Sequence, residues 1–325
     1  MNEVDVTAPL AARVVAAVPV VFGAAGRVCF GWFHAAASPA RGMGVLLCRP
    51  VGYEALCAYR AYKQLALQLA AAGFDVFSFD YDGTGDSAGE DADPGRVPAW
   101  VDSTIGAAAE LKRLGGVSRV ALFGLRLGAT LAAEAAARLD GVEGLVLWAP
   151  CASGRALVRE ILAANACRPA GKGPAGSRDV EALSCLYTAE TLEALKELDC
   201  HRVQSAPARR ALIIGRDDMP ADGRLAARYR ELGVDTTFAM WPGYQGMMAE
   251  PHEAVLESGT LNSIVEWLIK AASQQSRAVE ADRSAASFPA RAEDYLVDGI
   301  RETSLAFGSG DSLFGVLSEP AAPPR

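Results

Sequence analysis

Gly124 and Gly128 bracket Arg126 near the middle of the chain, in a spacing that could support catalysis. The apolar residues 120–123 before them predict a buried strand, and the alanine-rich residues 129–139 after them predict a helix. A strand, a Gly-x-X-x-Gly turn and a helix in this order are typical of a nucleophile elbow. Such a turn is strained and lifts its apex side chain above a sheet, and small neighbours let the strand and helix pass closely.

The apex of this turn is Arg126, where an elbow enzyme presents a serine or, less often, a cysteine or an aspartate. A guanidinium stays protonated in a protein and cannot attack a carbonyl carbon. The route through a covalent acyl-enzyme is therefore closed at this position. Arg126 could instead anchor a carboxylate, a phosphate or a developing oxyanion.

Asp217 and Asp218 are the candidates for the acid of a catalytic set. In elbow enzymes the acid and then the histidine follow the nucleophile along the chain. Both aspartates come directly after residues 210–214, which predict a strand. The spacing from Gly215 favours Asp218 and leaves Asp217 in reserve. The alternative is an ordinary turn carboxylate that caps the next segment.

The chain has three histidines, so the candidate base is found by elimination. His34 falls in the predicted opening hairpin, and His201 precedes a strand, on the side of the sheet away from the elbow. His252 alone follows the last predicted strand, although it is displaced by several residues from the place just after that strand. His252 is therefore the predicted base, and a histidine at a helix start is the alternative.

Two further groups complete the candidate site. The backbone N–H of Leu127, with that of Val51 or Gly52, would form an oxyanion hole and stabilise a transition state by about 2–3 kcal/mol per donor. Cys151 and Cys48 lie near the ends of predicted strands and are reserve nucleophiles. Neither cysteine lies on an elbow, and a buried cysteine is usually inert packing.

Apolar runs and helical segments alternate along the chain, which predicts a doubly wound, mostly parallel sheet. Ligands in such sheets bind beyond the carboxyl ends of the strands, where the elbow and the loops 49–54, 217–218 and 243–252 should meet. Predicted strands are 18–22, 28–34, 42–48, 74–80, 120–123, 144–148, 210–214 and 235–241, and predicted helices are 59–72, 97–114, 129–139 and 253–272.

Several stretches in this order resemble bacterial α/β-hydrolases of the serine-aminopeptidase-like branch, over about residues 18–270. They are Val51-Gly52-Tyr53-Glu54, FDYDGTGDSAG from Phe79, GLRLGATLA from Gly124, LVLWAP from Leu145, Gly154-Arg155-Ala156 with Arg159-Glu160, and Pro242-Gly243-Tyr244 with Pro251-His252. A subgroup of that branch is similar in carrying arginine at the elbow, and accompanies acyl-carrier, exosortase or secondary-metabolite pathways. The resemblance implies an α/β-hydrolase fold and acyl or peptidyl ester and thioester substrates, including ones bound to a carrier protein.

The chain divides into a predicted hydrolase domain over 1–272, a linker over 273–299 and a hairpin over 300–325. Residues 151–203 show no strand signal but include a Gly/Pro/Lys-rich patch at 168–176 and a predicted helix at 189–198. They form either a cap over the pocket or a long connecting loop. The change to Ser, Gln, Ala, Arg and Glu after Ala272 is typical of a linker.

The predicted C-terminal hairpin echoes the opening one. Residues 305–308 and 313–317 resemble 20–23 and 29–33 with one residue deleted. The echo predicts the start of a second hydrolase domain, and the alternative is chance likeness between two amphipathic hairpins. Because a lone hairpin is marginal in water, it should pair with this domain's sheet edge, a neighbouring subunit in a homodimer, or another partner.

Composition limits the partners. The 325 residues include 51 % hydrophobic and 22 % charged residues, an ordinary balance for a globular enzyme. The net charge of −8 disfavours nucleic acid or an anionic membrane as the main partner. Seven scattered cysteines without CxxC spacing favour reduced thiols and a cytoplasmic location over disulfides or zinc. No metal or cofactor, signal peptide or membrane span is expected.

Two functional hypotheses follow. In the first, His252, oriented by Asp218, deprotonates water or an acceptor that attacks an acyl carbonyl held near Arg126, without a covalent intermediate. In the second, the protein is a pseudoenzyme that serves as a binding or assembly module, and Arg126 forms an ion pair with Asp218 that fills the old pocket.

Overall fold

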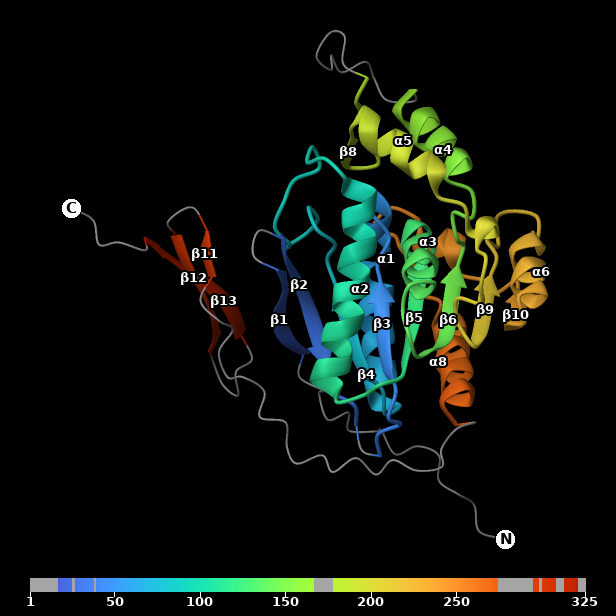
Figure 1. Cartoon of the computed structure of the whole chain (residues 1–325), viewed down its shortest axis with the longest axis horizontal. Coiled ribbons are helices and arrows are strands. Elements are labelled where there is room, and N and C mark those ends of the chain that lie inside the picture. Colours follow the sequence, from blue (N-terminus) through green and yellow to red (C-terminus); the bar gives the residue numbers. More distant parts are fainter. Residues whose placement is uncertain are drawn as a thin grey trace. The chain divides into compact units, whose positions relative to one another are not determined.

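In a computed structural model of the chain, the structure describes residues 17–24, 27–37, 39–166, 178–273, 295–297, 300–307 and 313–320 (Figure 1). The chain divides into two compact units, Met1–Val279 and Glu280–Arg325. The Gly/Pro/Lys-rich patch at 168–176 and most of the predicted linker lie outside the described residues.

The first unit is built on an eight-stranded sheet in the order β1-β2-β4-β3-β5-β6-β9-β10. β1 and β2 form an antiparallel hairpin, β2 pairs antiparallel with β4, and the remaining neighbours are parallel. The doubly wound, mostly parallel sheet is confirmed. Its strands are β1 (Ala17–Ala24), β2 (Arg27–His34), β3 (Gly44–Cys48), β4 (Asp75–Phe79), β5 (Val120–Leu125), β6 (Val142–Trp148), β9 (Arg210–Ile214) and β10 (Asp235–Ala239).

Helices cover both faces of this sheet (Figure 1). On one face, α1 (Tyr53–Ala71) packs beside α8 (Ser258–Ser273), and on the other α2 (Arg96–Gly115) packs beside α3 (Leu127–Ala136). Strands β3 and β5 are buried along their whole length, so their side chains alternate between two apolar cores. Within the described residues, no helix is long and apolar enough to cross a bilayer.

Two helix boundaries differ from the prediction. α1 begins at Tyr53 and not at 59, so Glu54 belongs to the first turn of a helix and not to a loop. α8 begins at Ser258, which leaves residues 253–257 outside it. Two short helices, α6 (Arg224–Glu231) and α7 (Tyr244–Met247), were not predicted.

Residues 151–203 carry elements that lie beyond the carboxyl ends of the strands (Figure 1). They are α4 (Gly154–Ala166), β7 (Val180–Ala182), β8 (Cys185–Tyr187), α5 (Ala189–Glu197) and the 3-10 helix η1 (Cys200–Arg202). The predicted helix at 189–198 matches α5. The absence of strands was wrong: β7 and β8 pair as a two-stranded hairpin, too short to produce an alternating pattern. We call residues 151–203 the cap.

The second unit contains a three-stranded antiparallel sheet of β11 (Tyr295–Val297), β12 (Ile300–Phe307) and β13 (Leu313–Pro320). Its register repeats that of the opening hairpin. Leu305 pairs with Gly315 as Val20 pairs with Gly31, and the next equivalent pairs follow the same offset. The echo between the two hairpins therefore extends from sequence to backbone pairing.

Candidate functional site

The turn between β5 and α3 has the geometry of a nucleophile elbow. Arg126 adopts φ 53° and ψ −124°, a backbone conformation that a side chain disfavours. A Cβ on Gly124 would lie 2.5 Å from the Cα of Ala129, and one on Gly128 would overlap carbonyl oxygens at the end of β3. Only glycine permits these approaches, as the sequence predicted.

The Arg126 side chain is held by two carboxylates. Its Nε lies 2.7 Å from Oε1 of Glu54, its Nη2 bonds Oε2 of Glu160, and the residue is only 6 % exposed. Glu54 is in the first turn of α1, and Glu160 is on the cap helix α4. Arg126 therefore ties the cap to the body of the domain. The predicted ion pair between Arg126 and Asp218 is not formed, because the two glutamates occupy the guanidinium.

Charge around Arg126 fixes its protonation and that of Cys151. Burial by itself lowers the pKa of Arg126, but Cys151, Glu54, Tyr244 and Glu160 together raise it above its ordinary value. Burial raises the pKa of the Cys151 thiol to about 12, although Arg126 opposes the rise. At neutral pH Cys151 is a neutral thiol, which is a poor nucleophile.

The two candidate acids have other partners. Asp218 accepts hydrogen bonds from Arg216 at 2.9 Å (Nε) and 2.6 Å (Nη2), which lower the pKa of its carboxyl. Asp217 accepts the backbone N–H of Gly243 at 2.7 Å and of Gln245 at 3.0 Å, and so fixes the start of α7. Each aspartate positions a neighbouring loop.

His252 lies on the surface, with a side chain that is 78 % exposed. Its Nε2 is 3.8 Å from Oε1 of Glu253, and it has no contact with Asp218 within the described part of the chain. The structure therefore does not bring His252, Asp218 and Arg126 together as a catalytic set.

Tyr244 fills the region just after β10 where the histidine of such a set was sought. It is buried, and the Arg216 guanidinium carbon lies 4.7 Å from the centre of its ring. Burial raises the pKa of its hydroxyl, and Arg126 is close enough to oppose that rise. The place after β10 where a catalytic histidine was sought is therefore occupied by the aromatic side chain of Tyr244, whose hydroxyl stays neutral.

The cap covers one side of the predicted oxyanion hole. The carbonyl oxygen of Leu183 accepts the N–H of Tyr53 at 2.6 Å, and a Cβ on Gly52 would overlap that oxygen. Val51 is buried beside it, and Leu127 is the first residue of α3. Leu183 itself has φ 52°, so the cap turn is strained where it meets the body.

A cavity of about 270 Å³ lies on the other side of Arg126, between α4, the ends of β6 and β9, and α6. His201 lines it, so the prediction that this residue lies away from the working edge was wrong: η1 turns it back toward the elbow. The Nδ1 of His201 is 3.1 Å from Oδ1 of Asp199. Other lining residues include Cys151, Leu157, Glu160, Arg216, Met219 and Phe238.

Sequence reasoning missed four residues of this site: Glu54, Glu160, Tyr244 and His201. The first three stand inside the stretches that carry the family resemblance, which was the signal that could have found them. His201 had no such signal, because its position depends on how the cap folds. No cluster of metal-ligating side chains occurs among residues the structure describes.

Comparisons with known proteins agree with this geometry. Residues 57–214 match the family model of serine aminopeptidase, S33. No curated protein matches the chain.

Solved structures match at low sequence identity. Est1E from Butyrivibrio proteoclasticus with bound ferulic acid is 13 % identical, with a TM-score of 0.57 over 77 % of this chain and 98 % of that one. A soluble variant of monoglyceride lipase from Saccharomyces cerevisiae with a substrate analogue is 12 % identical, with a TM-score of 0.56 over 81 % of this chain and 98 % of that one. A thermostable carboxyl esterase from Bacillus coagulans is 14 % identical, with a TM-score of 0.56 over 79 % of this chain and 99 % of that one. The chain therefore has the α/β-hydrolase fold, and its residues 57–214 match the serine aminopeptidase, S33 family model.

Proposed function

We propose that this chain is a hydrolase-fold binding protein that has no acyl-enzyme route and holds a small acyl-bearing ligand in the cavity beside Arg126. One observation carries the proposal. The apex of the elbow is an arginine whose guanidinium is buried against Glu54 and Glu160. A nucleophile is replaced there by a permanent cation that joins the cap to the body.

The other two positions of a hydrolase triad support the same conclusion. Asp218 is bonded to Arg216, and Tyr244 lies where a histidine would orient a serine. Each position is filled by a side chain with a structural partner. The fold and the elbow are kept, while the described residues at the three triad positions do not form a nucleophile, acid and base set.

The cavity itself has the chemistry of an acyl site. Most of its lining is apolar, from Leu157, Ile213, Met219 and Phe238, and Arg126 lies at one end. Such a site accepts a short apolar chain and orients a carbonyl or carboxylate toward the guanidinium. Est1E with ferulic acid and the yeast lipase with a substrate analogue have the same fold. Esters, thioesters and amides of small acids are therefore the proposed ligands, free or on a carrier protein.

The test combines labelling, turnover and binding. We expect no stoichiometric labelling by a fluorophosphonate and no turnover of p-nitrophenyl butyrate or butyryl thioester above buffer, because Arg126 cannot attack a carbonyl and the Cys151 thiol that lines the cavity stays neutral. Ferulate should bind, and Ala156→Phe, which fills the cavity, should weaken its binding at least about tenfold. Ala163→Phe, on the exposed face of the same helix α4, is the control. Labelling of any serine or cysteine would contradict the proposal.

A second candidate function rests on His201. Its Nδ1 is bonded to Asp199, and its ring lines the cavity that contains Arg126. This pair could remove a proton from a water that attacks an acyl carbonyl, with the carbonyl oxygen near Arg126. The same thioester assay separates the two: turnover that is lost in His201→Ala and kept in His252→Ala would establish the enzyme. Without turnover the binding function remains.

The C-terminal hairpin is proposed to join a second hydrolase sheet. β13 corresponds to β2, and the outer edge of β2 pairs with β4 in the first unit. β13 should therefore pair with a β4-like strand of another domain, on a second copy or another chain. Deleting residues 280–325 is expected to dissociate the assembly, so that the mass in solution falls by more than the mass of the deleted residues. The thermal midpoint of the remaining domain should stay within about 2 °C of that of the full chain. An unchanged mass would argue against the assembly.

A further inference from the structure

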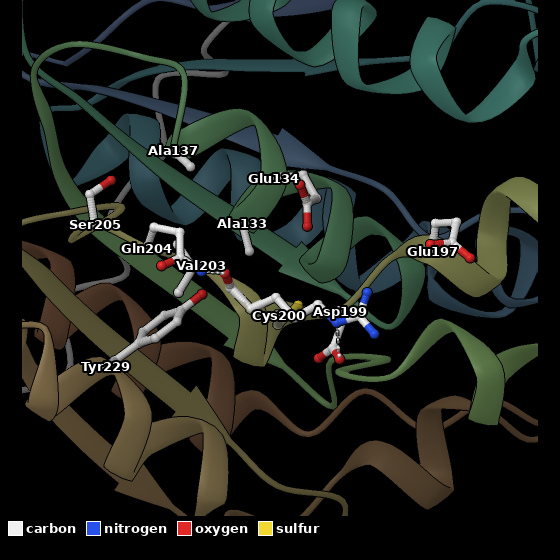
Figure 2. Close-up of a pocket in the computed structure, with 11 residues that line it drawn as sticks. Ala133, Glu134, Ala137, Glu197, Asp199, Cys200, Val203, Gln204, Ser205 and Tyr229 are labelled. Carbon is white, nitrogen blue, oxygen red and sulfur yellow. Dashed lines mark hydrogen bonds and ion pairs between the residues drawn. The ribbon is translucent and has the colours of Figure 1, made fainter.

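A second cavity, of about 370 Å³, lies away from Arg126, at the far end of α3. Its walls come from the last turn of α3, from η1 and the residues after it, and from α6 (Figure 2). Its volume is in the range of small-molecule sites in proteins. The lining residues are Ala133, Glu134, Ala137, Glu197, Asp199, Cys200, Arg202, Val203, Gln204, Ser205 and Tyr229.

Two polar groups in this cavity have no hydrogen-bond partner among the residues that the structure describes. The Tyr229 side chain is 1 % exposed and lines the cavity, and no described residue hydrogen bonds to its hydroxyl. The half-buried Glu134 carboxylate also accepts no hydrogen bond within the described ranges. Figure 2 shows both side chains directed into the same space from opposite walls. A buried polar group is normally satisfied, so the Tyr229 hydroxyl favours a ligand in this cavity, while the Glu134 carboxylate is partly exposed to solvent.

The charge of the cavity favours a cation. Glu134, Glu197 and Asp199 are acidic, whereas Arg202 is the one basic residue of the lining, and it is already 3.3 Å from Asp199. The last turn of α3 adds the negative end of a helix dipole at Ala133 and Ala137.

Glu134 is the carboxylate that a cation would reach. Burial raises the pKa of its carboxyl, the nearby Arg138 opposes the rise, and Asp199 adds to it. A positive group placed between Glu134 and Tyr229 would offset both the burial of the Glu134 carboxylate and its repulsion by Asp199.

The rest of the lining indicates what kind of cation fits. Ala133, Ala137, Val203 and the Tyr229 ring offer apolar surface beside the two polar groups. The described residues hold no set of three metal-ligating side chains here, which disfavours a bare metal ion. An ammonium group at the end of a short hydrocarbon chain matches both the polar and the apolar parts.

We infer that this cavity binds a small primary amine, whose ammonium group donates hydrogen bonds to the Glu134 carboxylate and the Tyr229 hydroxyl oxygen while its chain packs on Val203 and Ala137. The site is separate from the cavity beside Arg126 and does not depend on the function proposed for it. Both η1 and α6 contribute to the two linings, and in η1 His201 lines one cavity and Cys200 the other.

The test uses butylammonium as the probe and 1-butanol as its uncharged counterpart, with the full chain and ligand-observed NMR. Five non-hydrogen atoms in a matched site allow a Kd of about 1 mM. Glu134→Gln and Tyr229→Phe should each weaken butylammonium binding at least about tenfold, because the first removes the negative charge that faces the ammonium group and the second removes the hydroxyl acceptor. Glu193→Gln, on the exposed side of α5, should bind like the unchanged protein.

Three results would overturn the inference: no butylammonium binding at concentrations well above 1 mM, equal binding of 1-butanol, or unchanged binding in Glu134→Gln. Folding of each variant is checked by its circular dichroism and thermal midpoint. Should Tyr229→Phe fail to fold, Glu134→Gln still decides, since its side chain keeps the shape and loses only the charge.

Discussion

Replacing Arg126 with alanine is expected to destabilise the protein by about 2–4 kcal/mol. The change leaves Glu54 and Glu160 facing a space with no cation, and a broken buried ion pair costs more than an exposed one. Glu160 is half exposed, so water recovers part of its loss and keeps the effect below that of a fully buried pair. Urea unfolding of the unchanged and variant proteins measures the difference.

A glycine variant separates the two roles of this residue. Arg126→Gly loses the same ion pairs as Arg126→Ala, but it removes the strain of a side chain at φ 53°. It should therefore unfold with about 1 kcal/mol more free energy than Arg126→Ala. Two equally stable variants would show that the elbow is not strained in solution.

Double-mutant cycles identify the partners. Because Arg126 contacts both carboxylates, Arg126→Met should couple to Glu54→Gln and to Glu160→Gln, by about 0.5–3 kcal/mol each. The same arginine change should be additive with Asp218→Asn, because Asp218 bonds Arg216. Coupling of Arg126 to Asp218, without coupling to Glu54 or Glu160, would support the ion pair that the sequence suggested. It would contradict the ion pairs that the structure shows.

Most of the fold could be predicted from the sequence because its signals are local. The buried strands are short apolar runs, and residues 210–214 form β9 at the predicted bounds. The elbow was predictable for a steric reason, since only glycines at 124 and 128 allow the approach of β5, α3 and β3. What failed were the helices α4 and α6, and elements of three or four residues, β7, β8 and α7, in which no period can repeat.

The site was less predictable, because ion pairs are chosen by geometry between distant segments. Asp218 and Glu54 are both carboxylates at the same edge of the sheet, and sequence reasoning assigned the Arg126 ion pair to Asp218 and did not consider Glu54. Glu54 reaches Arg126 because α1 begins at Tyr53, and Asp218 is taken by Arg216, two residues away. His201 could not be placed without the fold of the cap. Local chemistry therefore predicted the residue types at the working edge but not their pairing.

The elbow keeps its steric demands although its apex carries no nucleophile. A strained turn holds one side chain at a fixed point above the sheet, whatever that side chain is. In this chain the point lies between α1 and α4, so the same geometry that would aim a serine at a substrate aims a guanidinium at two helices. The contacts of Arg126 with Glu54 and Glu160 therefore support one role for this turn, which is to hold the cap helix α4 against the body of the domain.

Gly128→Ala is therefore expected to destabilise the protein by about 4 kcal/mol or more. The new Cβ would overlap the carbonyl oxygens of Arg49 and Cys48. These are backbone atoms at the end of a fully buried central strand, so neither partner can move without disturbing the sheet. We expect the variant to unfold at much lower urea or to be recovered only as insoluble protein.

Gly106→Ala is the matched control, because it adds the same methyl group inside α2. Its Cβ would meet only the Phe22 ring, at 3.8 Å, which is an ordinary contact. Alanine also favours the helix, so this variant should be more stable than the unchanged protein by about 0.5–1 kcal/mol. A soluble Gly128→Ala protein as stable as Gly106→Ala would mean that α3 and the end of β3 lie farther apart than described, and that Arg126 is not fixed between Glu54 and Glu160 by the turn.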